Sequence, residues 1–330
     1  MNMNLTMKAQ SSLKKKFLGF IKEYMILVAI VILALVTAIA EPRFLSLENM
    51  TNIMRQFGPL IMVSLGMTFV IIGGFIDLSV TGIVSLVAVV TLSLIEPLGQ
   101  IPALLIGLAL GAICGLLTST IIISCGALTQ AEALFITFGM STVYGAIALI
   151  YTGGETNHLS WVTRDTSLFK AIGQGNVGFI SVSFLIFLVV LAILWVFQNK
   201  TYMGRAISLT GGNKTAAWLT GININRCIRT IYVICGFMTA LGAIVLFSRV
   251  TTASPVLGKG YETNAILSVV VGGTSLAGGK GSVLRTVLGV LLVTLLSNCL
   301  NMLEVSAYMQ VVLRGAILIA AIWLDSTRHR

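Results

Sequence analysis

Long apolar segments recur from one end of this 330-residue chain to the other. Apolar residues make up 57% of the sequence and charged residues only 10%. A soluble domain of this length needs a far larger charged surface. Because helices formed by most of these segments would cross about 30 Å of hydrocarbon, the pattern predicts an all-α polytopic membrane protein.

The apolar runs define about ten transmembrane helices. A β-barrel is disfavoured because the runs are continuous rather than alternating. The third and eighth adjoin glycine pairs, and the eighth is shorter than a full crossing, so broken or re-entrant helices are expected there. The predicted spans are residues 24–40, 56–73, 79–95, 103–123, 133–151, 177–197, 229–248, 264–277, 284–302 and 307–324.

The distribution of positive charge predicts the orientation. With both termini in the cytoplasm, fourteen Lys and Arg residues fall inside and six outside, and Arg314 lies within the last span. Residues 1–23 then form a basic cytoplasmic N-terminus. The net charge of +10 is explained by this topology and by contact with membrane lipid. No nucleic-acid partner is expected, since no basic surface domain interleaved with aromatic residues is present.

The first span also has features of a signal peptide, with Ala38-Ile39-Ala40 at its end. It is longer than a usual signal core of about 7–15 residues, which favours an uncleaved helix over cleavage after Ala40. The five cysteines fall in spans or on the predicted inner side. No disulfide framework is therefore expected.

A single transmembrane domain, residues 1–330, accounts for the chain. Its largest outer segment is 153–176, which leaves no room for a second folded domain. The run from Thr274 to Gly281 superficially resembles a phosphate loop, but it lacks the first Gly and the Ser or Thr that follows Lys. His158 and His329 do not form a metal cluster. We expect neither covalent catalysis nor a bound cofactor.

The inner segment 198–228 contains the signals of a short helix. Asn213 is a good N-cap, residues 214–220 favour helix, and Gly221 suits the left-handed position after its end. We expect Ala217 and Trp218 on its apolar side. A connector at the membrane interface and a docking element for a cytoplasmic partner are equally compatible with this spacing.

Two short segments indicate an internal repeat. Residues 70–74 and 269–273 share a pattern of three apolar residues followed by two glycines. Transporters often carry broken helices at matching positions of two halves. In the fourth span, Gly107, Gly111 and Gly115 fall on one face and favour close helix packing.

Polar residues at membrane depth are the candidates for a pathway. Arg314 lies too deep in its helix to reach water easily, so it should face the bundle interior or a polar cavity and pair with an acid or with backbone carbonyls. Asn298, Asn301 and Gln310 either line a pathway with it or only bridge helices. For Asp77, capping of the third span is favoured over substrate contact. Acids are too few for a proton relay: Asp77, Glu132 and Glu262 each lie near a span end.

A set of motifs runs in order through nearly the whole chain. These are Gly73-Gly-Phe-Ile-Asp-Leu-Ser-Val80, Leu134-Phe-Ile-Thr-Phe-Gly-Met140, Gly204-Arg205, Gly211-Gly-Asn213 with Ala216-Ala217 and Gly221-Ile-Asn223, Gly258-Lys-Gly-Tyr-Glu262 with Ala265-Ile266, Val270 through Gly281, and Val305 through Gln310 with Arg314-Gly315. Together they resemble the permease subunits of bacterial ABC importers for monosaccharides, the ribose-type family. Three positions depart from the pattern: Thr81 and Tyr144 stand where the family usually has Gly and Arg, and Asn264 where it has Asp.

The resemblance implies partners. A second permease copy, identical or not, would complete the membrane core in the bacterial inner membrane. A cytoplasmic ATPase would bind ATP and Mg²⁺, and an external binding protein would deliver the sugar. The loop that couples to the ATPase would be formed by Gly204, Arg205, Gly211, Gly212, Asn213, Ala216, Ala217, Trp218 and Gly221.

A neutral sugar needs amides, hydroxyls and backbone groups rather than a compensating charge. The candidates for its pathway are Asp77, Glu262, Asn264, Asn298, Asn301, Gln310 and Arg314. A gradient-driven transporter is the alternative from another class, but it predicts a buried ion site that the sequence does not provide. A permease of the same architecture for a branched-chain amino acid, a nucleoside or a signalling sugar derivative is a further alternative.

Overall fold

The computed structural model describes residues 25–328 of the chain. The predicted basic N-terminus, residues 1–23, lies outside the described residues, as does His329. The helices and strands in chain order are α2 (Met25–Ala40), η1 (Pro42–Leu45), α3 (Leu47–Ile72), α4 (Val80–Leu98), α5 (Gln100–Ser124), α6 (Gln130–Thr152), β1 (Asn157–His158), η2 (Leu159–Trp161), α7 (Ser167–Gln174), β2 (Asn176–Val177), β3 (Ile180–Ser181), α8 (Val182–Lys200), α9 (Tyr202–Gly212), α10 (Lys214–Leu219), α11 (Ile224–Val250), β4 (Thr252–Ala253), α12 (Tyr261–Val271), α13 (Val283–Met302) and α14 (Ala307–Arg328).

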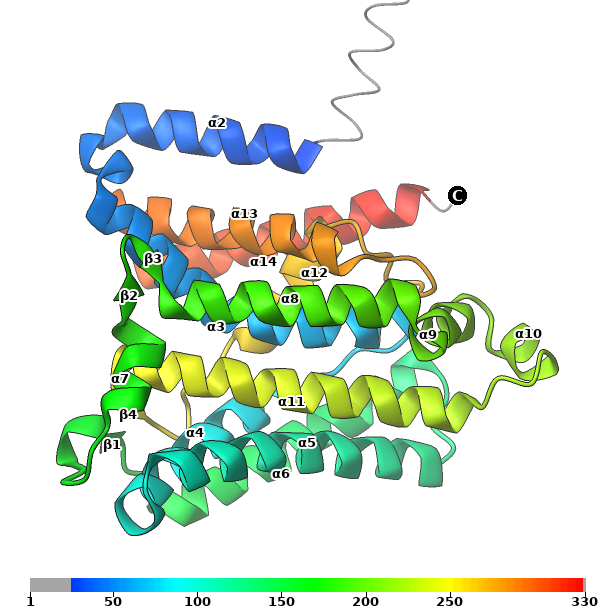
Figure 1. The fold of residues 1–330 in the computed structure, drawn as a ribbon. Helices are drawn as coiled ribbons and strands as arrows, with labels where there is room; N and C mark the ends of the chain where they lie inside the picture. Colours follow the sequence, from blue (N-terminus) through cyan, green and yellow to red (C-terminus); the bar gives the residue numbers. More distant parts are fainter. Residues whose placement is uncertain (1–24, 329–330) are drawn as a thin grey trace, which may run out of the picture.

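Long helices lie side by side and build an all-α bundle, as the sequence predicts (Figure 1). Each predicted span contains one helix, and within residues 25–328 seven helices are long and apolar enough to cross a membrane. The helices of the first, eighth and tenth predicted spans, α2, α12 and α14, are not among these seven. α12 has 11 residues, so it rises only about 16 Å, roughly half the hydrocarbon thickness. The chain is therefore a multi-pass membrane protein with a half-helix at membrane depth.

Several predicted boundaries differ from the helix ends, and two of them were placed across a break in the chain. The sixth span was placed from residue 177, but α8 begins at Val182 after an antiparallel turn in which Val177 pairs with Ile180. The eighth was extended to residue 277, but α12 ends at Val271. In both cases a glycine with positive φ breaks an apolar run, at Gly178 and Gly273.

The centre of the bundle is formed by α3 and α11. Within their apolar windows 89% of α3 and 72% of α11 is buried, against 17% of α8. The glycine stripe of the fourth span supports this packing, as predicted. A Cβ on Gly111 would lie 2.5 Å from the Gly236 carbonyl oxygen of α11, and one on Gly115 would clash with the Tyr232 carbonyl. The α5–α11 contact therefore depends on small residues that let two backbones approach.

The repeated glycine pairs end two helices with the same backbone motif. At the end of α3, the Phe75 N–H donates to the Val70 carbonyl oxygen at 3.1 Å. At the end of α12, the Thr274 N–H donates to Val269 at 3.2 Å. Both are the six-to-one bond of a Schellman cap, closed by a left-handed glycine, Gly74 or Gly273. The predicted repeat is thus a repeated helix break.

The two ends of the bundle differ in character (Figure 1). One end carries α7 and the short pairs of β1 with β4 and β2 with β3. The opposite end carries α9 and α10, and both the start of α2 and the end of α14 lie toward that side. The chain therefore enters and leaves the described bundle on the face that bears the predicted coupling segment.

Candidate functional site

The α10 helix is defined by local caps at both ends. The Asn213 Oδ1 accepts from the Ala216 N–H at 2.9 Å, so the predicted N-cap is present. At the other end the Ile222 N–H donates to the Ala217 carbonyl oxygen at 3.1 Å, and Gly221 has φ +82°. This is a Schellman cap with glycine at the left-handed position. The predicted helix over 214–220 is confirmed as Lys214–Leu219.

The exposed side of α10 differs from the expectation. Ala217 is only 3% exposed and packs in the main core cluster, so its predicted place on a free apolar side was wrong. Trp218 and Leu219 are 66% and 72% exposed. A helix of six residues is too short for its periodicity to show which face is buried. The large apolar side chains that α10 exposes are therefore Trp218 and Leu219.

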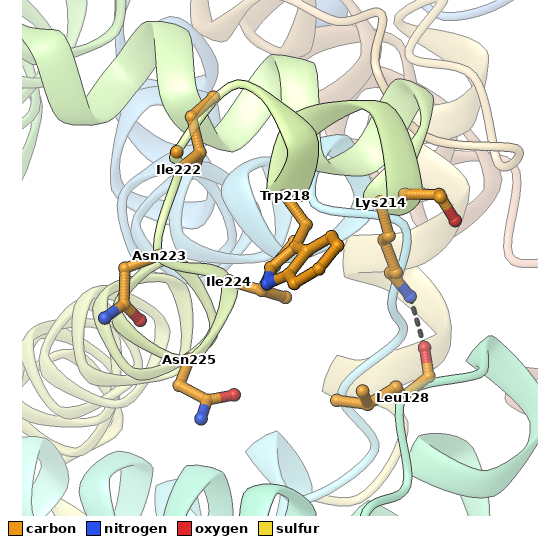
Figure 2. Close-up of a pocket in the computed structure, with 9 residues that line it drawn as sticks. Leu128, Lys214, Trp218, Ile222, Asn223, Ile224 and Asn225 are labelled. Atoms are coloured by element: carbon orange, nitrogen blue, oxygen red, sulfur yellow. Dashed lines mark hydrogen bonds between the residues drawn. The ribbon is translucent and has the colours of Figure 1, made fainter.

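A pocket of about 660 Å³ lies beside α10, between it, the start of α11 and the turn that links α5 to α6. Trp218 and Lys214 both extend toward it, as Figure 2 shows. Its lining residues are Leu128, Lys214, Thr215, Trp218, Gly221, Ile222, Asn223, Ile224 and Asn225. The lining combines aromatic, aliphatic and amide groups, so this face can hold an inserted protein side chain.

Lys214 attaches α10 to two other parts of the molecule. Its Nζ donates to the Leu128 carbonyl oxygen and lies 3.9 Å from the centre of the Phe75 ring. Partial burial lowers the pKa of Lys214, and the nearby Glu132 carboxylate opposes this shift. The Lys214 ammonium therefore contacts the Leu128 carbonyl and the face of the Phe75 ring in place of water.

The other predicted coupling residues lie in α9 and its ends. Gly204 is buried where the chain turns from α8 into α9, while Arg205 is exposed. Gly211 and Gly212 form the last turn of α9 and approach the end of α3. The structure therefore brings the coupling candidates together in one α9–α10 segment.

The predicted pathway residues, by contrast, fall into three separate groups. The first contains Asp77, which is fully buried in the loop between α3 and α4. Its Oδ1 accepts from the Ser79 N–H at 2.9 Å and from the Ser79 hydroxyl at 2.6 Å. Asp77 thus stabilises the turn that enters α4, but the N-cap of that helix is Ser79 and no side chain caps it, so the favoured capping role of Asp77 was wrong.

The first turn of α12 packs against the start of α4. The Thr81 hydroxyl donates to the Glu262 carboxylate, and the Gly258 N–H donates to the Ser85 hydroxyl at 3.0 Å. Asn264 follows on α12 and is partly buried. Two helices that begin inside the bundle therefore meet at their N-terminal turns, an arrangement found around transporter binding sites.

The second group is a bridge between α13 and α3. The Asn298 amide donates to Asn49 Oδ1 at 2.9 Å, and the Asn49 amide donates to Asn298 Oδ1 at 3.1 Å. Asn49 also donates to the Phe44 carbonyl at 2.8 Å. Because both side chains are buried and mutually satisfied, this pair bridges helices and does not face a pathway.

The third group is a ladder along the α13–α14 turn. Arg314 donates to Gln310 at 3.1 Å, and Gln310 donates to Asn301 at 2.8 Å. The prediction that Arg314 pairs with an acid or with backbone carbonyls was wrong, because its acceptor is the side-chain carbonyl oxygen of Gln310. Within residues 25–328 the one ion pair joins Arg43 and Glu41, and the amide of Gln310 serves as the partner of Arg314.

Two functional contacts escaped the sequence reasoning. Thr81 was noted only as a departure from the family pattern, yet it binds Glu262. Tyr144, another departure, is buried and donates to the Cys114 carbonyl at 2.8 Å. Such contacts join residues far apart in the sequence, so no local spacing pattern predicts them. Their only signal was the unusual residue type at each position.

Broken helices that meet at membrane depth, together with a short capped helix at one face, define a transport protein of the permease class. The chain belongs to the family described as branched-chain amino acid transport system / permease component, whose model matches residues 49–322.

Relatives at similar length agree with this assignment. The ribose import permease protein of Haemophilus influenzae is 35% identical over 93% of this chain and 94% of its own. The galactose/methyl galactoside import permease protein of Escherichia coli is 34% identical, covering 96% and 97%. The D-allose transport system permease protein of the same organism is 32% identical, covering 98% of each. No solved structure matches the chain significantly.

Proposed function

We propose that this chain is the inner-membrane permease subunit of an ATP-driven importer for a monosaccharide of the ribose class. An external binding protein delivers the sugar, and two permease copies form the passage. A separate cytoplasmic ATPase subunit binds ATP and Mg²⁺. Both termini of the permease lie in the cytoplasm.

The observation that carries this proposal is the similarity to sugar permeases along the whole chain. Three relatives that differ in cargo are all named as permeases for neutral monosaccharides. Identity is highest, 35%, to a ribose permease among these three. The family description names branched-chain amino acids, which makes leucine the appropriate competing cargo for a test.

The α9–α10 segment supports the coupling part of the proposal. α10 is fixed by a cap at each end, and it exposes Trp218 and Leu219 beside a pocket. Exposed aromatic and aliphatic residues next to a concavity are typical of a protein interface. In this proposal Trp218 and Leu219 contact the ATPase, while Asn213 and Gly221 hold the helix in shape.

The positive-inside distribution supports the orientation. Lys200, Arg205, Lys214, Arg226 and Arg229 all lie in or beside α9 and α10, on one face of the bundle. Cytoplasmic loops carry such an excess of Lys and Arg. The opposite end, with α7 and the strand pairs, then faces the binding protein.

The decisive experiment is uptake by a reconstituted complex. The tagged chain is purified with the subunits that accompany it and placed in proteoliposomes with its binding protein. We expect ATP-dependent uptake of labelled ribose that exceeds uptake of galactose, allose and leucine. Uptake driven by a proton or sodium gradient without ATP would overturn the proposal. Preferential uptake of leucine would retain the importer class and replace the cargo.

A further inference from the structure

The last turn of α9 is in direct backbone contact with the end of α3 and with the loop 272–282 that follows α12. A Cβ added to Gly211 would clash with the Ile72 carbonyl oxygen at the end of α3 and would lie 2.9 Å from the Gly279 nitrogen. A Cβ on Gly278 would lie 2.7 Å from the Gly211 oxygen and 2.8 Å from the Gly74 Cα. No side chain fits between these backbones.

A hydrogen bond joins the loop 272–282 to the end of α3. The Gly279 N–H donates to the Ile72 carbonyl oxygen at 2.8 Å. Gly279 would also bring a Cβ within 2.7 Å of the Gly212 Cα. We call the contact of these three segments the glycine junction; its members are Gly73, Gly74, Gly211, Gly212, Gly278 and Gly279.

Lys214 makes a second attachment one residue beyond the α10 N-cap. Its ammonium lies over the ring of Phe75, which immediately follows Gly74 and is fully buried. The same ammonium donates to the Leu128 carbonyl. α10 is therefore held to the loop 73–79 by a side chain, and α9 is held to it by backbone contact.

The two attached loops connect to the two helices that meet at the Thr81–Glu262 contact. Loop 73–79 runs past Asp77 into α4, whose first turn carries Thr81. Loop 272–282 leaves the C-terminal end of α12, whose first turn carries Glu262. The Thr81–Glu262 hydrogen bond joins α4 to α12, and α9 contacts the loops attached to both helices. α9, the two loops and the two helices are therefore connected to one another.

We propose that the glycine junction and Lys214 transmit displacement of α10 to the two broken helices, so that docking events at α10 reposition the Thr81–Glu262 contact. Contacts between backbones have no flexible side chain to absorb a shift, and close-packed interiors transmit strain. The two loops then move with α9 as a unit. This inference rests on the proposed function for the origin of the movement, while the linkage itself consists of contacts within the chain.

The first test breaks the junction with one methyl group. Gly211→Ala must displace the Ile72 carbonyl, which separates α9 from the end of α3. In the reconstituted complex we expect the sugar transported per ATP hydrolysed to fall by about tenfold, a typical size for coupling between sites. ATP hydrolysis itself persists, because Trp218 and Leu219 are untouched. Gly145→Ala is the matched control, since a Cβ there meets no atom within 4 Å.

The second test removes the Lys214 attachment and keeps the backbone intact. Lys214→Met should also lower the sugar transported per ATP hydrolysed. It tests the proposal independently if Gly211→Ala does not fold. Lys200→Met is its control, because Lys200 is an exposed lysine 6.0 Å from the Trp195 ring centre. A wild-type ratio in Lys214→Met, or in a folded Gly211→Ala, would overturn the proposal.

A readout without ATP separates this inference from the proposed function. Ile76→Cys, introduced after replacement of the native cysteines, places a thiol in loop 73–79. We expect its labelling by a maleimide to rise about tenfold in Lys214→Met, since loss of contacts promotes local opening. Unchanged labelling would overturn the linkage. Absence of ATP-driven uptake by the wild-type complex would instead contradict the proposed function and leave the labelling result interpretable.

Discussion

The Thr81 hydroxyl on α4 donates a hydrogen bond to the Glu262 carboxylate on α12, across 181 positions of the sequence. Both helices begin inside the bundle, and this bond joins their first turns. Glu262 also accepts from the Thr263 hydroxyl at 3.1 Å. The contact needs a side-chain hydroxyl, which Gly, the residue usual at this position in the ribose-type pattern, could not supply.

Thr81→Val should weaken the joint between α4 and α12. The isosteric change removes the donor and leaves Glu262 with one hydroxyl partner. We expect a loss of about 1 kcal/mol of stability, the size found for hydrogen bonds between helices in membranes. Thermal unfolding of the purified protein in detergent measures it. Thr120→Val is the control, since that hydroxyl binds only a carbonyl of its own helix; equal stability of the two variants would contradict the prediction.

The Asn49–Asn298 pair should show strong mutual dependence. Asn49→Leu or Asn298→Leu alone leaves a buried amide without its partner, at a cost of about 1–3 kcal/mol each. The double variant removes both amides and should cost less than the sum of the single changes. Unfolding of all four proteins in a double-mutant cycle gives the interaction energy. Additive losses would show that the two amides act independently.

Local signals were sufficient for the ends of α10 but not for its orientation. Asn213 and Gly221 act within one turn of their own position, so the sequence predicted both caps correctly. The burial of Ala217 depends on the core beneath α10, to which distant segments contribute. Capping is local chemistry, whereas burial is decided by tertiary packing.

The same distinction explains the candidate pathway. Apolar runs predicted every long helix, because the bilayer sets both their length and their composition. Hydropathy could not show that Asn298 pairs with Asn49 while Asn301 pairs with Gln310. These partners are chosen by helix neighbours, and a polar residue looks alike in sequence whether it lines a passage or bridges two helices.

Arg314→Leu should impair transport more than folding. The change removes the donor to Gln310, which keeps its own bonds to Asn301 and to the Val305 carbonyl. The ladder therefore survives in part, and we expect near-normal amounts of protein in the membrane with reduced uptake. Arg314→Lys should recover part of the activity, since it restores a charge but not the planar guanidinium. Wild-type uptake in Arg314→Leu would show that this cation is dispensable.

The orientation can be tested by labelling from each side. In a background without native cysteines, Lys214→Cys should react only after the membrane is permeabilised, and Asn157→Cys should react in intact cells. The physical reason is the excess of Lys and Arg around α9 and α10, which favours a cytoplasmic location. The reverse pattern would invert the topology and place α10 outside the reach of a cytoplasmic ATPase.

The surface of α10 gives the most direct test of coupling. Leu219→Asp alters a side chain that is 72% exposed, so the fold should be unaffected. If Leu219 contacts the ATPase, the charge must be desolvated in the interface, and we expect sugar-stimulated ATP hydrolysis to fall at least about tenfold. Ala217→Glu should instead destabilise the protein, because Ala217 is buried within the chain.

Gly221→Val should have an intermediate effect on stability, since valine at φ +82° costs about 1–2 kcal/mol and distorts the end of the helix. Thermal unfolding and ATP hydrolysis of all three variants separate these effects, and full coupling in Leu219→Asp would show that this surface is not the docking contact.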